Sequence, residues 1–230
     1  MIHAFGDPDP PVPRLMAALV ARGHEIRAAQ ASRPEGRTTL VLGPGVSLDS
    51  MALGVLLGAW RTAPGARVLV LSLVGAHRDA RARRLRDLWD LEERARGSGM
   101  PVLTLRFAPL LGRECPLWLR LRSRPRLPHD GRQILHPVCE DDAVETLDRA
   151  LRDRAPWEGW YEVAGEEALT LAEIAALAAA AGPPLARGAG EWEPPLEEMA
   201  EHRLCEAGPW RDHFGIVPAR VSERARAWAG

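Results

Sequence analysis

Residues 1–30 read MIHAFGDPDPPVPRLMAALVARGHEIRAAQ. A short apolar run, 2–5, ends at Gly6, and a proline-rich turn follows it. The segment 12–22 has apolar residues at helical spacing and predicts a helix, with Leu15, Leu19 and Val20 on its buried face. A second short apolar run covers 25–30. This order of strand, turn, helix and strand predicts the first βαβ unit of an α/β domain.

The composition is that of an ordinary globular protein. The chain has 230 residues, 46% of them hydrophobic and 27% charged, which is enough for one large domain or a main domain with a small appendage. The net charge of −1 disfavours a general nucleic-acid partner. No apolar run is long enough for a membrane span, and no signal peptide is evident, so we expect a cytoplasmic protein with no membrane partner.

Two residue types are missing from the sequence. The chain contains no lysine and no asparagine, and all 30 basic residues are arginine. A GC-rich bacterial genome explains this usage. The chemical consequence is that no lysine ammonium or Schiff base is available to any mechanism. The three cysteines, Cys115, Cys139 and Cys205, are widely spaced and form neither a disulfide framework nor a Cys-x-x-Cys zinc pair.

Alternating strands and helices continue after the opening unit. We expect strands at 37–43, 66–72 and 101–107, with helices at about 49–61 and 78–97 between them. Ser47 or Asp49 would cap the first of these helices. The connection 31–37 is too short to hold a strand with its loops, so we expect the sheet to lack a strand there. The whole pattern predicts right-handed crossovers and a parallel sheet.

The second half of the chain has a different texture. We expect a loop at 108–112, an arginine- and proline-rich stretch at 116–136 with a short strand near Ile134, and a helix from about 141 to 152. A strand at 160–164 follows. Thr170 and Glu173 form the capping-box pattern before a helix that runs to about 181, and a final helix is expected near 217–229.

Several segments, in the same order, resemble one known family. The chain resembles a divergent member of the atypical or extended short-chain dehydrogenase/reductases, of the NAD-dependent epimerase/dehydratase-like or NmrA-like kind. The matching segments are Gly6 with GHEIR at 23–27, LSLVGA at 71–76, Glu92 with SGMP at 98–101, LTLR at 103–106, HPVCEDDA at 136–143, and YEVAG at 161–165 with LTLAEI at 169–174.

This resemblance implies a fold and a site. The implied fold is a Rossmann-type, doubly wound parallel sheet: 1–112 would form the nucleotide-binding-type core, and 113–230 a smaller, mainly helical substrate-side part, with 133–164 contributing back to the core sheet. The implied cofactor is NAD(P). The implied cofactor-binding residues are Gly6, Arg27, Arg33, Gly43 and Gly45.

The phosphate-binding turn departs from the family pattern Gly-x-x-Gly-x-x-Gly. Counted from Gly6, the second glycine falls on Asp9 and the third on Val12. The carboxylate of Asp9 therefore lies at the position where the backbone would approach a pyrophosphate. Asp7 adds a second negative charge. The four prolines of the turn, at 8, 10, 11 and 13, have no N–H to donate. We therefore expect a rigid turn, a degenerate site, and weak or absent NAD(P) binding.

The catalytic pair of the family is also missing. The resemblance places a Tyr-x-x-x-Lys pair on the helix after the strand that ends at Ser72, where the lysine lowers the pKa of the tyrosine for proton exchange. Counted back from Glu92, the lysine position falls on Leu88 and the tyrosine position on or near Arg84. Ser72 remains as the candidate catalytic residue. The single tyrosine, Tyr161, is expected to be a packed aromatic on a different strand.

Three other groups allow functional alternatives. The stretch 129–142 contains histidines, acids and Cys139, so a nucleophilic Cys–His pair with His136 is conceivable, although the spacing matches no zinc signature and we expect no metal. The arginines at 120, 122, 124 and 126 fit either an anion grip or, more simply, a solvated loop. The acidic segment 191–201 fits a lid, a partner-binding helix or a packed terminal helix.

These observations favour a divergent epimerase-like protein without the standard hydride transfer, acting as a binding, regulatory or assembly protein. The alternative is an active NAD(P)-dependent sugar epimerase/dehydratase or reductase with an atypical site. Small-molecule or protein partners and homo-oligomerisation are left open by the sequence.

Overall fold

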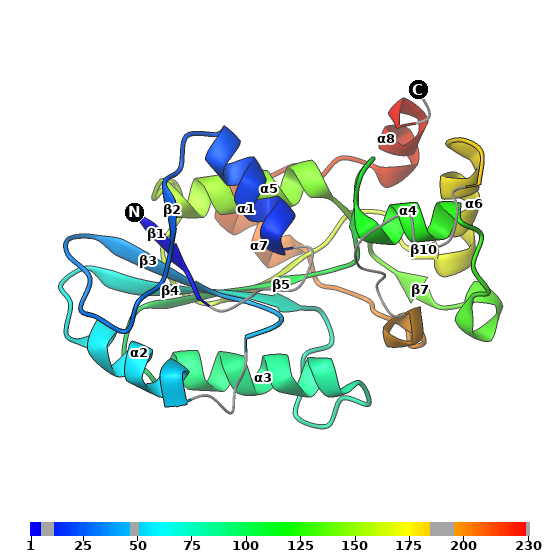
Figure 1. Cartoon of the computed structure of the whole chain (residues 1–230). Helices are drawn as coiled ribbons and strands as arrows, with labels where there is room; N and C mark the ends of the chain where they lie inside the picture. Colours follow the sequence, from blue (N-terminus) through cyan, green and yellow to red (C-terminus); the bar gives the residue numbers. More distant parts are fainter. Residues whose placement is uncertain (6–11, 47–50, 185–195, 229–230) are drawn as a thin grey trace. The chain divides into compact units, whose positions relative to one another are not determined.

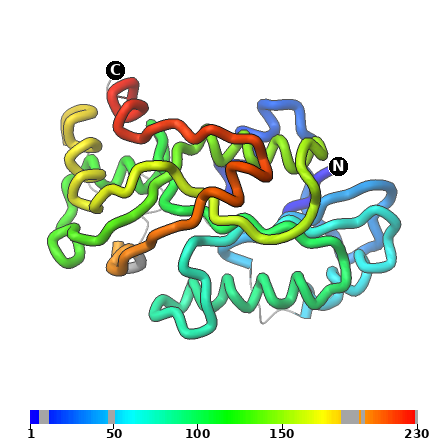
Figure 2. The backbone as a smooth tube through the Cα atoms, turned by 180° about the vertical axis from the view of Figure 1, so that it is seen from behind, coloured from blue at the N-terminus to red at the C-terminus, as the bar shows by residue number. Residues whose placement is uncertain are grey.

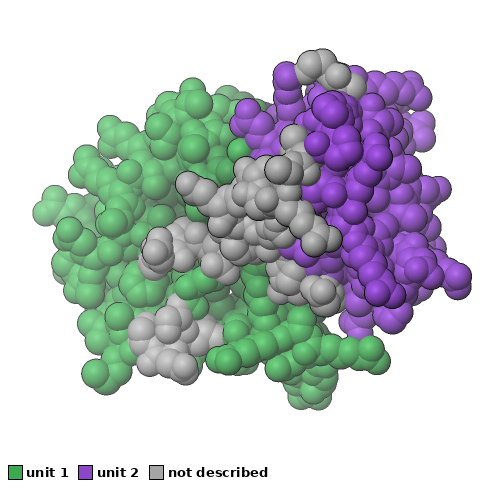
Figure 3. Space-filling view, turned by 45° about the vertical axis from the view of Figure 1, so that its right-hand side comes forward, with its two compact units in different colours: residues 1–106, 147–161 green, residues 107–146, 162–230 purple. Residues whose placement is uncertain are grey.

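The structure is a computed structural model that describes residues 1–5, 12–46, 51–184 and 196–228. The chain divides into two compact units, coloured separately in Figure 3. Unit 1 contains Met1–Arg106 and Leu147–Tyr161, and unit 2 contains Phe107–Thr146 and Glu162–Gly230. Each unit is described by itself.

A six-stranded sheet forms the centre of the fold, in the order β2-β1-β3-β4-β5-β9 (Figure 1). The strands are β1 (Ile2–Ala4), β2 (Ile26–Ala28), β3 (Thr38–Leu42), β4 (Ala66–Leu73), β5 (Val102–Phe107) and β9 (Trp160–Val163). Strands β1 to β4 pair in parallel, and Ile2 lies opposite both Ile26 and Thr39. The expected α/β, Rossmann-type parallel sheet is confirmed.

Helices cover both faces of the sheet in unit 1. Helices α2 (Met51–Arg61) and α3 (Arg83–Arg96) lie on one face, and α1 (Val12–Ala21) lies on the other, as two opposite views show (Figures 1 and 2). Strand β4 is almost fully buried because it is covered on both sides. This layering places the carboxyl ends of β3 and β4 next to the start of α3.

The main core cluster lies between the sheet and helices α2 and α3. Even-numbered residues of β3 and β4, including Leu42 and Val70, pack there against Leu85, Leu88 and Leu91 of α3. On the opposite face, the buried side of α1 consists of Val12, Leu15, Met16 and Leu19. The expectation that Val20 is buried is wrong. Val20 is 54% exposed, because the buried face of this helix contains Met16 in its place.

The connection between β2 and β3 is short and irregular. Residues 29–37 contain no strand, as expected from their length. Gly36, with φ of +67°, turns the chain into β3. As a result β2, only three residues long, is the edge of the sheet.

Unit 2 consists of short strands and helices. Its two small sheets pair β7 with β10 in antiparallel and β6 with β8 in parallel. The elements are β6 (Leu110–Leu111), α4 (Pro116–Arg122), η1 (Pro128–Gly131), β7 (Ile134–Leu135), β8 (Val138–Cys139), β10 (Leu169–Thr170), α6 (Leu171–Ala180), η2 (Leu196–Met199), α7 (Gly208–Phe214) and α8 (Val221–Ala227). Helix α5 (Glu140–Leu151) begins in unit 2 and ends in unit 1.

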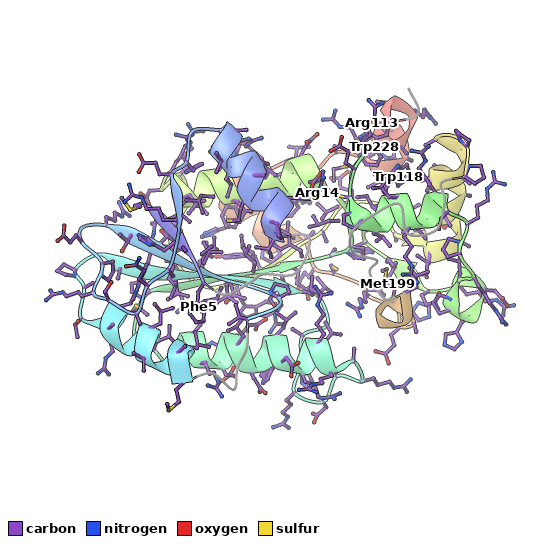
Figure 4. The ribbon with its side chains drawn as sticks, in the orientation of Figure 1. Phe5, Arg14, Arg113, Trp118, Met199 and Trp228 are labelled. Atoms are coloured by element: carbon purple, nitrogen blue, oxygen red, sulfur yellow. The ribbon has the colours of Figure 1, made fainter. Side chains whose placement is uncertain are left out.

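Hydrogen bonds and aromatic contacts hold the C-terminal segment of unit 2. The Trp210 indole N–H donates to the Thr146 hydroxyl at 3.1 Å. The rings of Trp118 and Trp228 meet edge to face with centroids 4.9 Å apart, and Figure 4 labels both. In the part of the chain that the structure describes, no helix is long and apolar enough to span a membrane.

Three expected elements differ from the structure. The long helix of 78–97 begins only at Arg83, because residues 74–82 form turns in which the Arg86 guanidinium holds the carbonyls of Ala80 and Arg81 at 2.6 and 2.7 Å. The arginine- and proline-rich stretch that begins at 116, whose arginines were interpreted as a solvated loop, contains α4. The final helix expected at 217–229 spans only Val221–Ala227, and α7 precedes it.

Candidate functional site

A pocket of about 440 Å³ lies within unit 1, where the carboxyl end of β3 meets α3. We call it the α3 pocket. Its described lining comes from the loop after β3 and from one face of α3, and consists of Gly43, Pro44, Gly45, Val46, Arg83, Arg84, Asp87, Leu88 and Leu91. Open α/β sheets bind ligands beyond the carboxyl ends of their strands, so this is the expected place for a site.

The loop side of the pocket depends on two glycines. A Cβ on Gly43 would lie 3.1 Å from Cγ2 of Val12, so glycine permits α1 to approach the end of β3 closely. Gly45 has φ of +92°, a left-handed conformation that side chains rarely adopt, and the Val46 N–H closes the turn onto the Gly43 carbonyl at 3.2 Å. Gly43 is therefore explained by the packing of α1 against β3, and Gly45 by its backbone conformation.

The helix side combines charge and apolar surface. The guanidinium of Arg83 and the carboxylate of Asp87 are 3.6 Å apart, one helical turn from each other; Arg83 is largely exposed and Asp87 about half exposed. Arg84 is half-buried, whereas Leu88 is 3% exposed and belongs to the main core cluster. The pocket therefore has a charged rim and an apolar wall.

Arg84 and Leu88 are the residues that the sequence resemblance places at or near the tyrosine and lysine positions of that family. They are one turn apart on α3, and both line the α3 pocket. A guanidinium stays protonated at any ordinary pH and a leucine has no proton to exchange, so this pair can bind but cannot perform general acid–base chemistry.

Ser72, the candidate catalytic residue, lies near the carboxyl end of β4. It follows Val70 on the face of the sheet that α2 and α3 cover, because side chains alternate along a strand. It is 1% exposed, and its hydroxyl has no hydrogen-bond partner among the residues that the structure describes. Ser72 is not part of the described lining of the α3 pocket.

The other predicted cofactor-binding residues are distributed differently. Gly43 and Gly45 line the α3 pocket, whereas Arg27 on β2 and Arg33 in the following connection are exposed and do not. Arg27 lies 3.7 Å from Glu25. Gly6 and the phosphate-turn residues 7–11 are outside the described residues, as are the helix-cap candidates Ser47 and Asp49 and the greater part of the acidic segment 191–201.

Tyr161 has the wrong environment for proton transfer. It lies on β9, and burial followed by the nearby carboxylate of Glu158 raises the pKa of its hydroxyl. A tyrosine that exchanges protons in this kind of reaction needs a lowered pKa. This agrees with the interpretation of Tyr161 as a packed aromatic.

Cys139 in unit 2 is not activated as a nucleophile. Burial, with a smaller contribution from Asp142, raises the pKa of its thiol to about 12. The Cys139 sulfur lies 3.8 Å from the Ala219 carbonyl, while Nδ1 of His136 accepts from the Cys205 N–H at 3.4 Å. Across the described stretches of the chain, no group of three or more His, Cys, Asp or Glu is arranged to hold a metal ion.

The arginine-rich stretch of unit 2 is partly helical. Arg120 and Arg122 lie on α4, which starts with Pro116 and buries Leu117, Trp118 and Leu121. The Arg122 guanidinium donates to the Pro183 carbonyl at 3.4 Å. The interpretation as a loop is therefore wrong for this part: the arginines alternate with apolar residues over a few positions, which hides the helical period. An anion-binding role for these arginines stays a prediction.

Glu92 and Arg106, both from segments that carry the family resemblance, form a buried ion pair in unit 1. Glu92 is fully buried, and its two carboxylate oxygens accept from Nε and a terminal nitrogen of Arg106 at 3.0 and 2.6 Å. The guanidinium also lies over the ring of Trp160, 4.6 Å from its centroid. The pair joins α3 to β5 and is a structural feature of the core.

The residues predicted for a site do not include Arg83, Asp87 or Val46. The available signal was spacing: residues 83, 87 and 91, and residues 84 and 88, each repeat at the four-residue interval that places them on one helix face. What the sequence did not indicate was which loop would face them.

Searches with protein-family models and against curated proteins gave no match to the chain. Solved structures do match. MoeE5 in complex with UDP-glucuronic acid and NAD has a TM-score of 0.69 at 17% identity, over 98% of this chain and 96% of that one. The dTDP-glucose 4,6-dehydratase of Bacillus anthracis with NAD has a TM-score of 0.70 at 11% identity, over 99% and 94%.

A third similar structure is the UDP-glucose 4-epimerase of Thermotoga maritima with UDP-glucose, at a TM-score of 0.63 and 14% identity, over 99% of this chain and 97% of that one. At these identities the likeness shows the fold. The chain has the Rossmann-type fold that is found in NAD-dependent sugar epimerases and dehydratases, as the sequence resemblance implied.

Proposed function

We propose that this chain is a ligand-binding protein with an epimerase-type Rossmann fold that does not carry out the standard hydride transfer of that fold. Its role would be binding, regulatory or assembly-related. The observation that supports this most directly is the pair Arg84 and Leu88, which line the α3 pocket at the positions of the tyrosine and lysine of the resembled family.

The composition supports the same proposal. A replacement lysine cannot come from elsewhere in the chain, because the sequence has none. The single tyrosine has a raised pKa. Proton exchange during hydride transfer would therefore need a different pair of groups from the one that the resembled family uses.

The coenzyme side of the fold offers a further argument. Val12 stands at the third-glycine position of the phosphate turn, is 2% exposed, and packs against Gly43. The turn sequence before it contributes carboxylates and prolines in place of glycines and N–H donors. We infer that NAD(P) binds weakly or not at all.

The test is binding of nicotinamide coenzymes to the purified full chain. We expect no thermal stabilisation by NAD, NADH, NADP or NADPH at millimolar concentration, and no conversion of UDP-glucose in their presence. A ligand at 100 times its Kd stabilises a protein by about 2.7 kcal/mol, so a Kd near 10 µM would be plainly detected. Clear stabilisation by NADPH, with turnover, would overturn the proposal.

The second candidate is an active NAD(P)-dependent sugar epimerase/dehydratase or reductase with an atypical site. The observation that favours it is Ser72, a buried and unpartnered hydroxyl at the strand end where the family has its catalytic Ser or Thr. Similar folds have been solved with NAD and sugar nucleotides. In the same assay this candidate requires both coenzyme binding and turnover that is lost in Ser72→Ala.

A further inference from the structure

A loop of unit 2 carries three exposed arginines. Residues 120–132 contain five arginines and a single acid, Asp130. Two of these arginines belong to α4, whereas Arg124, Arg126 and Arg132 lie beyond it and are exposed. None of these three guanidinium groups forms an ion pair or a hydrogen bond with the residues that the structure describes. We call 124–132 the arginine loop; it projects from unit 2 between α4 and β7 (Figures 1 and 2).

The backbone of the arginine loop is left-handed at three residues that are not glycine. The φ angles are +54° at Arg124, +46° at His129 and +53° at Asp130. Such residues are strained and persist only where the surrounding structure holds them. Pro125 and Pro128 restrict the loop further, because their rings fix φ. The backbone that carries the arginines is therefore defined by the fold.

The base of the loop is fixed to α6. Gly131 is buried, and a Cβ at this position would lie 2.8 Å from the backbone nitrogen of Ala172, so only glycine fits. Gln133 donates from Nε2 to the Pro128 carbonyl at 2.8 Å, and its own carbonyl accepts from the Leu171 N–H at 2.9 Å. A surface that is already ordered loses less conformational entropy when it binds. The loop can therefore present its guanidinium groups without further ordering of its backbone.

The chemistry of the loop favours an acidic polypeptide as its partner. Guanidinium groups make planar, bidentate contacts with carboxylates. Single-stranded nucleic acids are held by aromatic stacking along a basic groove, but 120–132 contain no Trp, Tyr or Phe, and the chain has a net charge of −1. Membrane surfaces are held by apolar side chains beside basic ones, and none of the exposed large hydrophobic residues of the described chain lies in the loop.

We propose that the arginine loop binds an acidic segment of a partner polypeptide, with Arg124, Arg126 and Arg132 contacting its carboxylates. This goes beyond the proposed function and does not rest on it, because the loop belongs to unit 2 and involves neither the α3 pocket nor a coenzyme. The strained and anchored backbone then has a reason: it holds three cations in a fixed arrangement for the partner.

The experiment measures binding of a fluorescent peptide with six consecutive glutamates to the full chain, by fluorescence anisotropy. The comparison probes are the same peptide with six glutamines, an oligonucleotide of seven thymidines, which has six phosphates, and phosphatidylserine vesicles. We expect the glutamate peptide to bind at least tenfold more tightly than each comparison probe. Its binding should weaken as NaCl rises, because the contacts are ionic and exposed.

The decisive variant removes the three loop charges together, as Arg124→Gln, Arg126→Gln and Arg132→Gln. Its matched control removes three charges from exposed arginines of unit 1, as Arg61→Gln, Arg94→Gln and Arg154→Gln. We expect the loop variant to weaken binding of the glutamate peptide at least tenfold and the control to change it less than threefold. Lysine at the three loop positions keeps the charge without the planar fork, and should give intermediate binding. Thermal unfolding checks that all variants are folded.

The inference is overturned if the glutamate peptide does not bind, if the two glutamine variants weaken its binding equally, or if the oligonucleotide or the vesicles bind as tightly. It is also overturned if the peptide binds only to a variant in which the glutamates of 191–201 are glutamine, because the chain's own acidic segment would then be the occupant. Coenzyme-dependent turnover of UDP-glucose would overturn the proposed function and would leave each of these outcomes unchanged.

Discussion

At the scale of single residues, removing one partner of the buried ion pair Glu92 and Arg106 should strongly destabilise unit 1. We predict that Glu92→Gln lowers the free energy of unfolding by about 3–5 kcal/mol, the usual result of removing one partner of a buried ion pair. The physical reason is that the guanidinium of Arg106, only 12% exposed, is left without its carboxylate. Urea unfolding followed by circular dichroism measures the change.

The neighbouring residue Glu93 supplies the control. It pairs with Arg96 on the exposed side of the same helix, where both side chains are about half exposed. Exposed pairs contribute about 0–1 kcal/mol, so Glu93→Gln should change little. Similar losses in E92Q and E93Q would contradict the assignment of Glu92 to a buried structural pair.

Glu167 in unit 2 should make stability depend on pH. It accepts hydrogen bonds from the Ser222 N–H at 2.9 Å, the Ser222 hydroxyl at 2.5 Å and Arg220 Nε at 3.3 Å. Burial alone would raise its pKa, but these donors outweigh burial and lower it. A carboxyl with a lowered folded-state pKa contributes stability that is fully present above its unfolded pKa, about 4.3, and is lost as the pH falls through the folded value.

We therefore predict that Glu167→Gln is less stable than the wild type by about 1.5–3 kcal/mol at pH 7, the range for hydrogen bonds to a charged group. The difference should shrink as the pH is lowered below about 4, where the wild-type carboxylate becomes protonated. Thermal unfolding from pH 3 to 7 measures it. The adjacent exposed Glu166, which pairs with Arg211 at 2.8 Å, is the control: a pH profile of E166Q like that of E167Q would contradict the prediction.

At the scale of elements, α6 has the capping box that its sequence predicts. The Thr170 hydroxyl accepts from the Glu173 N–H at 3.1 Å, and the Glu173 carboxylate accepts from the Thr170 N–H at 2.7 Å. We predict that Thr170→Ala destabilises the protein by about 1 kcal/mol, within the usual range for a lost N-cap. Thr170→Ser keeps the acceptor oxygen and should stay close to the wild type in the same thermal unfolding measurement. Equal losses in the two variants would show that the cap oxygen is not what matters.

Elements with a strong local signal were predicted, and those that depend on tertiary packing were not. The capping box and the strands β3, β4 and β5 follow from residue type and spacing alone. Helices α4 and α7 are seven residues long, and each has a proline at its first or second position within a segment that has no clear helical period. They are defined by buried tryptophans, Trp118 and Trp210, whose packing partners lie far away in the sequence.

At the scale of the whole molecule, the order of segments predicted the fold, because alternating strands and helices with short connections allow few arrangements. The site could be predicted only in part. Gly43 and Gly45 were recognised at the end of a strand, and Arg84 and Leu88 were located by counting from Glu92. That these four residues line one pocket depends on how α3 packs on the sheet, which no local pattern encodes.

The coupling between the α3 pocket and the core is clearest at Leu88, the residue that the sequence resemblance places at the family's lysine position. Leu88 is 3% exposed within the main core cluster, so Leu88→Lys would place an ammonium group among apolar side chains. We predict a loss of about 3–5 kcal/mol, the size expected for an uncompensated buried charge. The nearly isosteric Leu88→Met should change the free energy of unfolding by less than about 1.5 kcal/mol.

Urea unfolding of both variants at pH 7 tests this, and the double variant Arg84→Tyr with Leu88→Lys extends it to coenzyme binding. We expect the double variant to be destabilised like L88K and to gain no stabilisation from NADH, because the phosphate turn still contains Asp9 and Val12 in place of glycines. The opposite result would be a double variant that is as stable as the wild type and is stabilised further by NADH. Position 88 would then tolerate a lysine in a coenzyme-binding protein. The packing of Leu88 in the main core cluster would then not explain why a lysine is absent from this position.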